Sequence, residues 1–369
     1  MKKRIPERIA ALQVVLRDMG LDAAMLYDRE NLIYFTGLDD LEGGALAVPA
    51  QGEAELFCLW MEAGHVRECG GIQKVTPYRF PADNQSTMMG KWLKTQGWKA
   101  PKLGFTRYFI SLKDFQCLHD ATPDMQVEDI AIPCYRLRSV KSPEEIQRIR
   151  TAGRALHAGM QAAVNAARPG ISETDVLAEA EYAMTKAGSM GSPFRMQVLT
   201  HSRQLSLHPY ASHALLEDNA PVVIHLGASC DGYAAKMCRT VFLGTPKPES
   251  VRIYETLIAA QKAAVAALRP GVTCGEIYDI ATACVEERGF GRQWVMDQIG
   301  YGVGIRQSEF YPIIAKNSPT VLEENMVVDL LLPTVYLPGA GGPRITDTIL
   351  IGRDGPEFLT EFPAEPVHQ

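Results

Sequence analysis

A β-hairpin is predicted by the stretch Pro221-Val-Val-Ile-His-Leu-Gly-Ala-Ser-Cys-Asp-Gly-Tyr-Ala-Ala-Lys-Met-Cys-Arg-Thr240. Apolar and β-branched residues form two runs on either side of a Cys-Asp-Gly turn signal. Each run carries one titratable side chain, His225 in the first and Lys236 in the second. Because an unpaired polar group is costly to bury, we expect these two side chains to serve a site.

The composition is that of a globular protein. The chain has 369 residues, of which 46% are hydrophobic and 22% charged, and its net charge is -6. A chain of this length usually forms two domains. The charge provides no basic surface, and no apolar run reaches the ~18 residues of a membrane span. We therefore expect neither nucleic acid nor a membrane as a partner, and the N-terminus shows no signal peptide.

The eight cysteines are scattered, without a Cys-x-x-Cys pair. This pattern is typical of reduced, mostly buried thiols and predicts a cytoplasmic protein. Cys230 and Cys238 lie on the predicted hairpin, so one of them could be reactive, although structural burial is the commoner case.

Strands and helices alternate over residues 1–134, which predicts an α/β domain. Strands are expected at residues 21–26, 44–48, 55–59 and 102–105, helices at 5–19, 63–68 and 87–95, and a helical or extended segment at 31–37. Residues 135–141 are expected to form a linker. Ser142-Pro-Glu-Glu145 then predicts a capped helix start, with the helix running to Ala167.

An internal repeat follows. Arg168-Pro-Gly-Ile-Ser-Glu-Thr-Asp-Val176 matches Arg269-Pro-Gly-Val-Thr-Cys-Gly-Glu-Ile277, 101 residues later. In each copy a helix precedes the Arg-Pro-Gly turn and a capped helix follows it. The repeat predicts two similar halves related by a pseudo-twofold axis, and a ligand site between them.

Further motifs are His208-Pro209, Gly300-Tyr-Gly-Val-Gly304, Met326-Val-Val328 and Arg344-Ile-Thr-Asp-Thr-Ile-Leu350. With the two-part layout and the repeat, they resemble the pita-bread superfamily of creatinases, aminopeptidases P and methionine aminopeptidases. The resemblance covers nearly the whole chain. It implies an α/β domain over residues 1–134 and an α+β pita-bread domain over residues 135–369, with a pseudo-twofold internal duplication.

The peptidases of this superfamily bind two metal ions through two Asp, one His and two Glu. The resemblance places these ligands at five positions that hold other residues in this chain: His225, Lys236, Tyr301, Leu331 and Thr346. Lysine and leucine are incompatible with a dinuclear cation site. We therefore expect no metal and no other cofactor, and predict that metallopeptidase activity is lost.

Creatinase and the ectoine-hydrolase-like proteins are metal-free members, and this chain resembles both. Pro338-Gly-Ala-Gly-Gly342 is similar to creatinase, and the tyrosine of the Gly300–Gly304 motif is similar to the ectoine hydrolases. The resemblance implies a metal-independent hydrolase of an amide or amidino C–N bond in a small, carboxylate-bearing nitrogenous compound. Two alternatives stay open: an inactive peptidase-like scaffold that binds peptide or protein, and a lyase, cyclase or isomerase of a biosynthetic pathway.

Three residues are candidates for catalysis by position. His208 matches the superfamily's substrate-side histidine and is expected to act as general acid and base, or else only to hydrogen-bond within a loop. His225 is expected to be a second base or a donor to a substrate carboxylate, or else a core imidazole. Tyr301 is a candidate donor to an oxyanion, or else an aromatic wall.

Four more residues are expected nearby. Lys236 would replace metal charge by holding a carboxylate or an oxyanion, unless its head reaches solvent. Arg306 is a second anchor for anionic groups, and Ser308 replaces a family histidine as a substrate contact. Glu309 is expected to orient water, or to pair with Lys236 or Arg306.

The resemblance also implies a homodimer, in which the N-terminal domain of one subunit caps the pocket of the other. Tyr34 and Phe35 are then candidate lid residues against a small-molecule substrate, or else ordinary surface.

Overall fold

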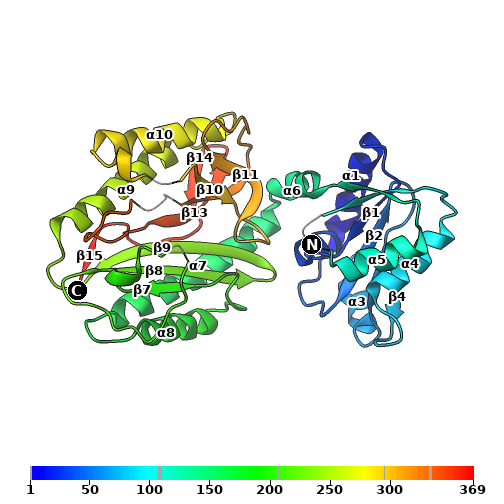
Figure 1. The fold of residues 1–369 in the computed structure, drawn as a ribbon, viewed down its shortest axis with the longest axis horizontal. Coiled ribbons are helices and arrows are strands. Elements are labelled where there is room, and N and C mark those ends of the chain that lie inside the picture. Colours follow the sequence, from blue (N-terminus) through cyan, green and yellow to red (C-terminus); the bar gives the residue numbers. More distant parts are fainter. Residues whose placement is uncertain (1, 107–109, 207, 295, 332–334) are drawn as a thin grey trace. The chain divides into compact units, whose positions relative to one another are not determined.

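The chain divides into two compact units, Met1–Arg138 and Ser139–Gln369 (Figure 1). This division comes from a computed structural model that describes residues 2–106, 110–206, 208–294, 296–331 and 335–369. The predicted boundary between residues 134 and 135 falls inside helix α6 (Ala131–Ser139). The predicted linker is therefore mostly helical.

The first unit is built on a six-stranded sheet in the order β4-β3-β2-β1-β5-β6. Its central strand β1 pairs parallel with β5 and antiparallel with β2, and all four of its residues are buried. The strands are β1 (Ala23–Leu26), β2 (Gly44–Pro49), β3 (Glu55–Leu59), β4 (Lys74–Tyr78), β5 (Lys102–Phe105) and β6 (Gln126–Asp129). The helices before α6 are α1 (Ile5–Asp18), α2 (Arg29–Thr36), α3 (Ala63–Cys69), α4 (Gln85–Thr95) and α5 (Leu112–Ala121). An α/β unit is thus confirmed.

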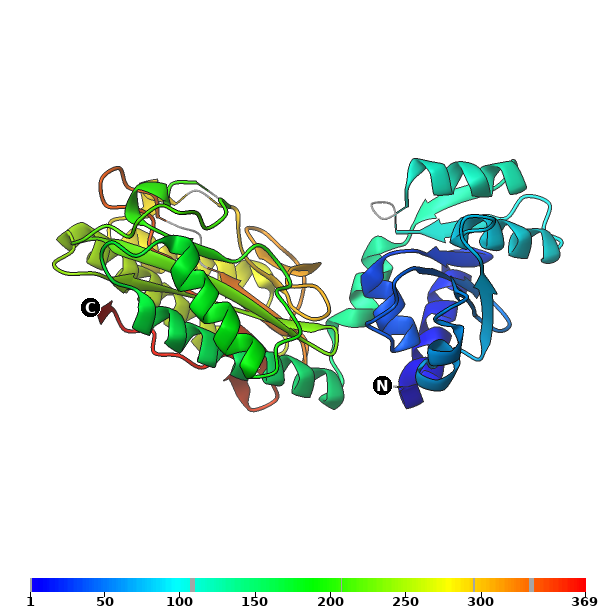
Figure 2. The same cartoon turned by 90° about the horizontal axis from the view of Figure 1, so that it is seen from below.

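Helix α7 (Pro143–Ala166) opens the second unit with the predicted cap. The Ser142 hydroxyl accepts from the Glu145 backbone N–H, and the Glu145 carboxylate accepts from the Ser142 N–H at 2.8 Å. Helix α8 (Glu173–Lys186) follows, and α9 (Pro248–Ala267) and α10 (Cys274–Glu287) form the second helix pair. In Figure 2 the green helices α7 and α8 lie in front of the sheet of this unit.

The sheet of the second unit has the order β11-β10-β12-β13-β9-β8-β7, with β14 added beside β13 and β15 beside β9. Its strands are β7 (Gln197–Leu199), β8 (Pro221–Cys230), β9 (Tyr233–Phe242), β10 (Gln298–Gly302), β11 (Glu309–Ala315), β12 (Val327–Leu331), β13 (Thr346–Gly352), β14 (Gly355–Phe358) and β15 (Val367–His368). The predicted hairpin is β8 and β9. With β11 set aside, β10-β12-β13 and β7-β8-β9 both follow the order of the chain inwards to the β13–β9 boundary, as a pseudo-twofold relation requires.

Backbone hydrogen bonds confirm the duplication at the spacing seen in the sequence. The N–H of Gly170 donates to the Leu216 carbonyl at 2.9 Å, and the N–H of Gly271 donates to the Leu322 carbonyl at 2.9 Å. Strands β7 and β10 also begin 101 residues apart, at Gln197 and Gln298. The two halves therefore repeat both the turn and the strand that follows it.

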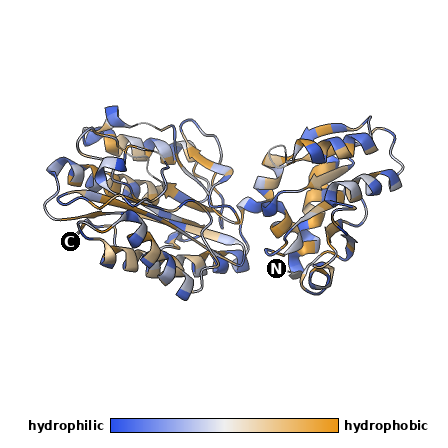
Figure 3. Cartoon of the chain, turned by 60° about the horizontal axis from the view of Figure 1, so that its bottom comes forward, coloured by the Kyte–Doolittle hydropathy of each residue, from blue (hydrophilic) through white to orange (hydrophobic). Residues whose placement is uncertain are grey.

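The two faces of this sheet differ in character. Val328, Leu330 and Ile349 point towards helices α9 and α10 and belong to one hydrophobic core. Their neighbours along the strands, such as Asp329 and Thr348, alternate to the opposite face. Figure 3 shows the strands at the centre of each unit as mostly hydrophobic. Among the described residues, no helix combines the length and the apolar character that a bilayer span requires.

Candidate functional site

The hairpin turn sets the register of the candidate site. Asp231 and Gly232 have φ values of 45° and 79°, the left-handed conformation that a two-residue hairpin turn of this kind needs. The register places His225 opposite Cys238 and Gly227 opposite Lys236. Residues directly opposite each other share a face of the sheet, so one face carries both titratable side chains.

The next strands extend this face. Thr346 pairs with Cys238, and β13 pairs with β12 so that Asp329 lies opposite Thr348. We call this face the polar face and define it by His225, Lys236, Cys238, Asp329, Thr346 and Thr348. All six side chains are buried. The sequence therefore places polar groups from four adjacent strands together in the interior.

The Lys236 ammonium forms an ion pair with the Asp329 carboxylate and donates to the Ser308 hydroxyl at 2.9 Å. The Lys236 side chain is 5% exposed and that of Asp329 is 0% exposed. This burial favours the prediction that Lys236 faces the site over the alternative that its ammonium group reaches solvent. Its charge partner is Asp329. Burial raises the pKa of Asp329, and the Lys236 ammonium opposes that rise.

His225 lies deep in the polar face. Its ring is 4.8 Å from the ring of Phe194, and its Nε2 has no hydrogen-bond partner among the described residues. The Oγ1 of Thr346 is likewise buried without a described partner. Burial, then the charges of Lys236 and Arg344, lower the pKa of His225 well below its ordinary value. This imidazole is therefore neutral at pH 7.

Cys238 lies between His225 and Thr346 in the row across the strands. Burial raises the pKa of its thiol to about 12. A thiol that stays protonated is a poor nucleophile, so a reactive Cys238 is not supported. The structure shows all eight cysteines as free thiols.

His208 lies on the segment between β7 and β8 and is exposed. Its backbone carbonyl accepts a hydrogen bond from Arg195 at 2.7 Å. Partial burial, then the charges of Arg344, Arg195 and Lys236, lower the pKa of His208. The positive charges of Arg344, Arg195 and Lys236 therefore act on this imidazole, whose catalytic role stays a prediction.

The other predicted site residues, Tyr301, Ser308, Glu309 and Arg306, each make a different kind of contact. Tyr301 lies at the edge of the polar face, with its ring centre 6.0 Å from the Lys236 Nζ, and its backbone N–H donates to Asp329. Ser308 contacts the Lys236 ammonium as described. Glu309 is buried and accepts from the Arg306 backbone N–H at 3.4 Å. The Arg306 guanidinium lies 5.3 Å from the ring centre of Phe310.

Tyr34 and Phe35 do not have the surface that a lid needs. Tyr34 is 7% exposed and its hydroxyl donates to the Leu137 carbonyl at 2.6 Å, while Phe35 is fully buried. Their rings pack edge to face. Both side chains thus belong to the interior of the first unit, contrary to the lid prediction.

Two important residues were missed by the sequence reasoning. Asp329 interrupts the apolar strand β12, which is the same signal that singled out Lys236. Arg344 is 4% exposed and donates to the Gln197 side chain at 3.2 Å and to the Gln204 carbonyl at 3.0 Å. It begins the Arg344–Leu350 motif two residues before strand β13, but the sequence alone indicated no role for its side chain.

The polar face does not fit a divalent-cation centre. An ammonium group has no lone pair to offer a metal, and Lys236 already neutralises Asp329. In the parts of the chain that the structure describes, no three His, Cys, Asp or Glu side chains form a group able to hold a metal ion. The side chain of Leu331, the fourth replaced position, lies outside the described residues.

Comparison with known proteins supplies the family context. Residues 147–353 match the model of metallopeptidase family M24, and residues 8–140 match the creatinase/prolidase N-terminal domain. An Xaa-Pro dipeptidase of Pyrococcus furiosus is 30% identical over 359 residues, which cover 97% of this chain and 99% of the relative.

Solved structures agree with this similarity. The prolidase of Pyrococcus horikoshii superimposes with a TM-score of 0.87 at 28% identity, covering 97% of this chain and 99% of that one. An Xaa-Pro dipeptidase of Bacillus anthracis superimposes with a TM-score of 0.91 at 25% identity, covering 99% of this chain and 100% of that one. The two-domain pita-bread architecture is therefore confirmed.

These findings overturn the predicted function. The matching relatives are named as dipeptidases and prolidases of a metallopeptidase family, whereas a metal-independent hydrolase of small nitrogenous compounds was predicted. The creatinase-like and ectoine-hydrolase-like assignment is wrong for the same reason. It rested on the replaced ligand positions, and the similarity of the chain as a whole points to the prolidases.

Proposed function

Because the chain belongs to metallopeptidase family M24, we propose that it is a peptidase of the prolidase type that acts on dipeptides. The observation that carries the proposal is the similarity over the full length of both units to relatives named for this activity. A dipeptide is also a small molecule with a carboxylate, which suits a site where Lys236 and Arg344 supply positive charge. We retain the homodimer and the cytoplasmic location as further proposals.

Peptide hydrolysis needs a group that takes a proton from water and returns it to the leaving nitrogen. We assign this role to His208, because partial burial and then the positive charges around it lower the pKa of its imidazole and keep it neutral at pH 7. A neutral imidazole accepts a proton, and the resulting imidazolium can give it back. His208 is exposed, so substrate and water can reach it.

We assign Lys236 the role of a fixed positive charge. An ammonium has three donors, and the described contacts to Asp329 and Ser308 use two of them. The third is available to a substrate carbonyl or carboxylate oxygen. The unpartnered atoms of His225 and Thr346 on the same face are two further hydrogen-bonding groups that a substrate can satisfy.

A divalent cation, when bound in a peptidase site, polarises the scissile carbonyl and activates water. The residues of this polar face do not fit such an ion, so the proton transfers above are assigned to the chain's own groups. The assay must therefore separate the peptidase activity from its metal requirement.

The test is hydrolysis of a panel of Xaa-Pro and Xaa-Ala dipeptides, followed by quantifying the released amino acids. Each reaction is run with a chelator and with added Mn²⁺, Co²⁺ or Zn²⁺. We expect cleavage of at least one dipeptide, a loss of about 10²–10⁴-fold in His208→Ala, and no loss in His157→Ala. His157 is the matched control, an exposed histidine on α7 of the same unit.

Three outcomes decide the proposal. Cleavage of no dipeptide under any condition refutes the peptidase assignment. Equal activity of the wild type and His208→Ala refutes the role of His208. Cleavage that occurs only with an added ion supports the peptidase assignment and refutes the role given to Lys236.

A further inference from the structure

Residues 200–206 and 208–213, the segment that carries His208, are held by hydrogen bonds from several side chains. Arg344 donates to the carbonyls of Gln204 and Ser206, at 3.0 and 3.2 Å. Gln197 donates to the Pro209 carbonyl at 3.0 Å, and Arg195 holds the carbonyl of His208 itself. These contacts replace the regular backbone pairing that a loop lacks.

A buried carboxylate organises the base of this segment. Glu173, the first residue of α8, is 0% exposed. Its Oε1 accepts from the Thr200 N–H at 2.9 Å, and its Oε2 accepts from Arg203 Nη1 at 2.6 Å. The same Oε2 accepts from the N–H and the hydroxyl of Ser212, at 2.9 and 3.0 Å. Glu173 thus joins both ends of the segment.

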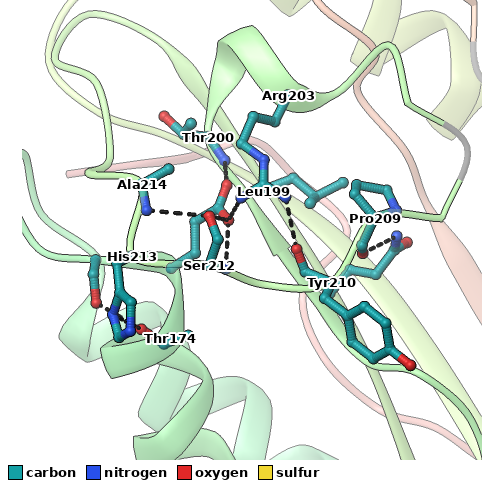
Figure 4. A network of polar contacts seen from close by, with 12 residues as sticks. Thr174, Leu199, Thr200, Arg203, Pro209, Tyr210, Ser212, His213 and Ala214 are labelled. Atoms are coloured by element: carbon teal, nitrogen blue, oxygen red, sulfur yellow. Dashed lines mark hydrogen bonds and ion pairs between the residues drawn. The ribbon is translucent and has the colours of Figure 1, made fainter.

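Figure 4 shows Thr200, Arg203 and Ser212 arranged around the hydrogen bonds that the Glu173 carboxylate accepts. Arg203 also donates to the Tyr210 carbonyl at 2.7 Å, two residues from His208. The contacts of Glu173 are charge-assisted and buried, the class of hydrogen bond that fixes geometry most strongly.

The internal duplication shows that the backbone contact at this position does not depend on a carboxylate. The position 101 residues later is Cys274, whose backbone N–H donates to the Thr320 carbonyl at 2.8 Å. The N–H of Glu173 makes the matching bond to Ala214 at 3.0 Å. The two halves therefore share the backbone contact, whereas the buried carboxylate occurs only in the half that carries His208.

We propose that Glu173 is a positioning residue, which through Arg203 and Ser212 holds residues 200–206 and 208–213 and thereby fixes the position of His208. The inference rests on the proposed function for the role of His208, but the placement itself can be measured without any activity. A displacement of about 1 Å at a catalytic group can reduce the rate about 100-fold.

The central variant is Glu173→Gln. An amide has one acceptor oxygen, so its NH2 group must face either the Thr200 N–H or the Arg203 and Ser212 donors. We expect kcat on a dipeptide to fall 10- to 100-fold with a small change in KM. The matched control is Cys274→Ala, at the equivalent position of the other half, for which we expect the wild-type rate.

The second readout is the titration of His208 by NMR in protein with ¹³C-labelled histidine, with the His208 resonance assigned from its absence in His208→Ala. In the wild type we expect a midpoint below 6.5, the ordinary value. In Glu173→Gln the midpoint should move up towards 6.5, because the imidazole loses its partial burial and then the neighbourhood of Arg344, Arg195 and Lys236. Cys274→Ala should leave it unchanged.

The outcomes separate positioning from general stability and from the proposed function. A lower melting temperature with an unmoved His208 midpoint and an unchanged kcat overturns the inference. Should Glu173→Gln fail to fold, Arg203→Gln removes the link from Glu173 to the Tyr210 carbonyl and leaves the contacts of Glu173 with Thr200 and Ser212, and the same two readouts decide. If no dipeptide is cleaved, the proposed function fails while the NMR midpoint still tests the placement.

Discussion

Replacing Lys236 by methionine tests whether the ammonium group is an integral part of the polar face. Methionine keeps an unbranched apolar side chain that is one heavy atom shorter, and removes the ammonium group with its charge and its hydrogen bond to Ser308. Asp329, which is 0% exposed, then keeps its negative charge in the interior without the Lys236 partner. Its remaining described contact is the N–H of Tyr301.

The burial of Asp329 sets the expected loss in the free energy of unfolding. Breaking a buried ion pair by removing one partner destabilises a protein by about 3–5 kcal/mol, because the other charge is left uncompensated. For a unit of 150–250 residues each 1 kcal/mol lowers the melting temperature by about 2–4 °C, which predicts a fall of roughly 6–20 °C. Lys236→Met also removes the group that lowers the pKa of Asp329, so that pKa should rise further.

This rise gives the variant a pH dependence of known sign. When the pKa of the folded Asp329 exceeds its unfolded value, the folded state binds the proton more tightly. The stability of Lys236→Met should therefore increase as the pH falls from 7 to 5, by at most about 1.4 kcal/mol per pH unit relative to the wild type. Calorimetry at both pH values measures both effects.

Two further variants make the experiment decisive. Lys262→Met is the matched control, because Lys262 in the same unit forms an exposed pair with Glu365 at 3.9 Å, for which less than about 1 kcal/mol is expected. Lys236→Met/Asp329→Asn removes the unpaired charge while keeping an acceptor for Tyr301, and should recover part of the loss. A loss in Lys236→Met no greater than that in Lys262→Met would refute the reasoning.

Three other predictions follow from the site. The kcat/KM for a dipeptide should rise with pH through a midpoint below 6.5, because only the neutral His208 accepts a proton and its pKa is lowered; a pH–rate profile with a higher midpoint contradicts this. Below pH 6.5 the wild type should lose up to about 1.4 kcal/mol of stability per pH unit through His225. The pKa of this imidazole is lowered in the folded protein, so the unfolded chain binds a proton at a higher pH than the folded one does. His225→Gln should remove this component in urea titrations at pH 7 and 5.5, and equal pH slopes would count against it. Gly227→Ala should cost about 1–3 kcal/mol, because its Cβ would lie 2.3 Å from the Phe194 ring, and Phe194→Leu should relieve the cost in thermal melts.

Most of the fold could be predicted because its signals are local. The cap at Ser142, the hairpin turn at Asp231-Gly232 and the repeated Arg-Pro-Gly turns each depend on side chains within a few residues. Strands β4 and β6 and helices α5 and α6 were missed for the opposite reason. All four residues of β6 are exposed and β4 buries only Tyr78, so neither strand shows an apolar pattern. Their pairing is decided by neighbours distant in the sequence.

The site could be predicted only in part, for the same reason. A charged residue in an apolar strand can be recognised as unusual, and this signal correctly selected Lys236. Its partner depends on the order of strands in the sheet, which brings β12 close to β9 through β13. As the partner of Lys236 the sequence favoured Glu309, which follows the Gly300–Gly304 motif, over Asp329, which lies in another strand of the sheet.

The charges of the polar face explain why the five metal-ligand positions of the peptidases are replaced together in this chain. In the peptidases that the chain resembles, four carboxylates surround two divalent cations, so the charges of ligands and ions balance. In this chain the corresponding positions hold His225, Lys236, Tyr301, Leu331 and Thr346, and they contribute no carboxylate at all. The single ammonium is balanced by Asp329 in β12, which is separated from β9 by β13. Replacing only one ligand would have left the remaining carboxylates uncompensated in the interior, at a cost of several kcal/mol per ion. Restoring one carboxylate alone would therefore add a buried negative charge that Lys236, which is already paired with Asp329, does not balance.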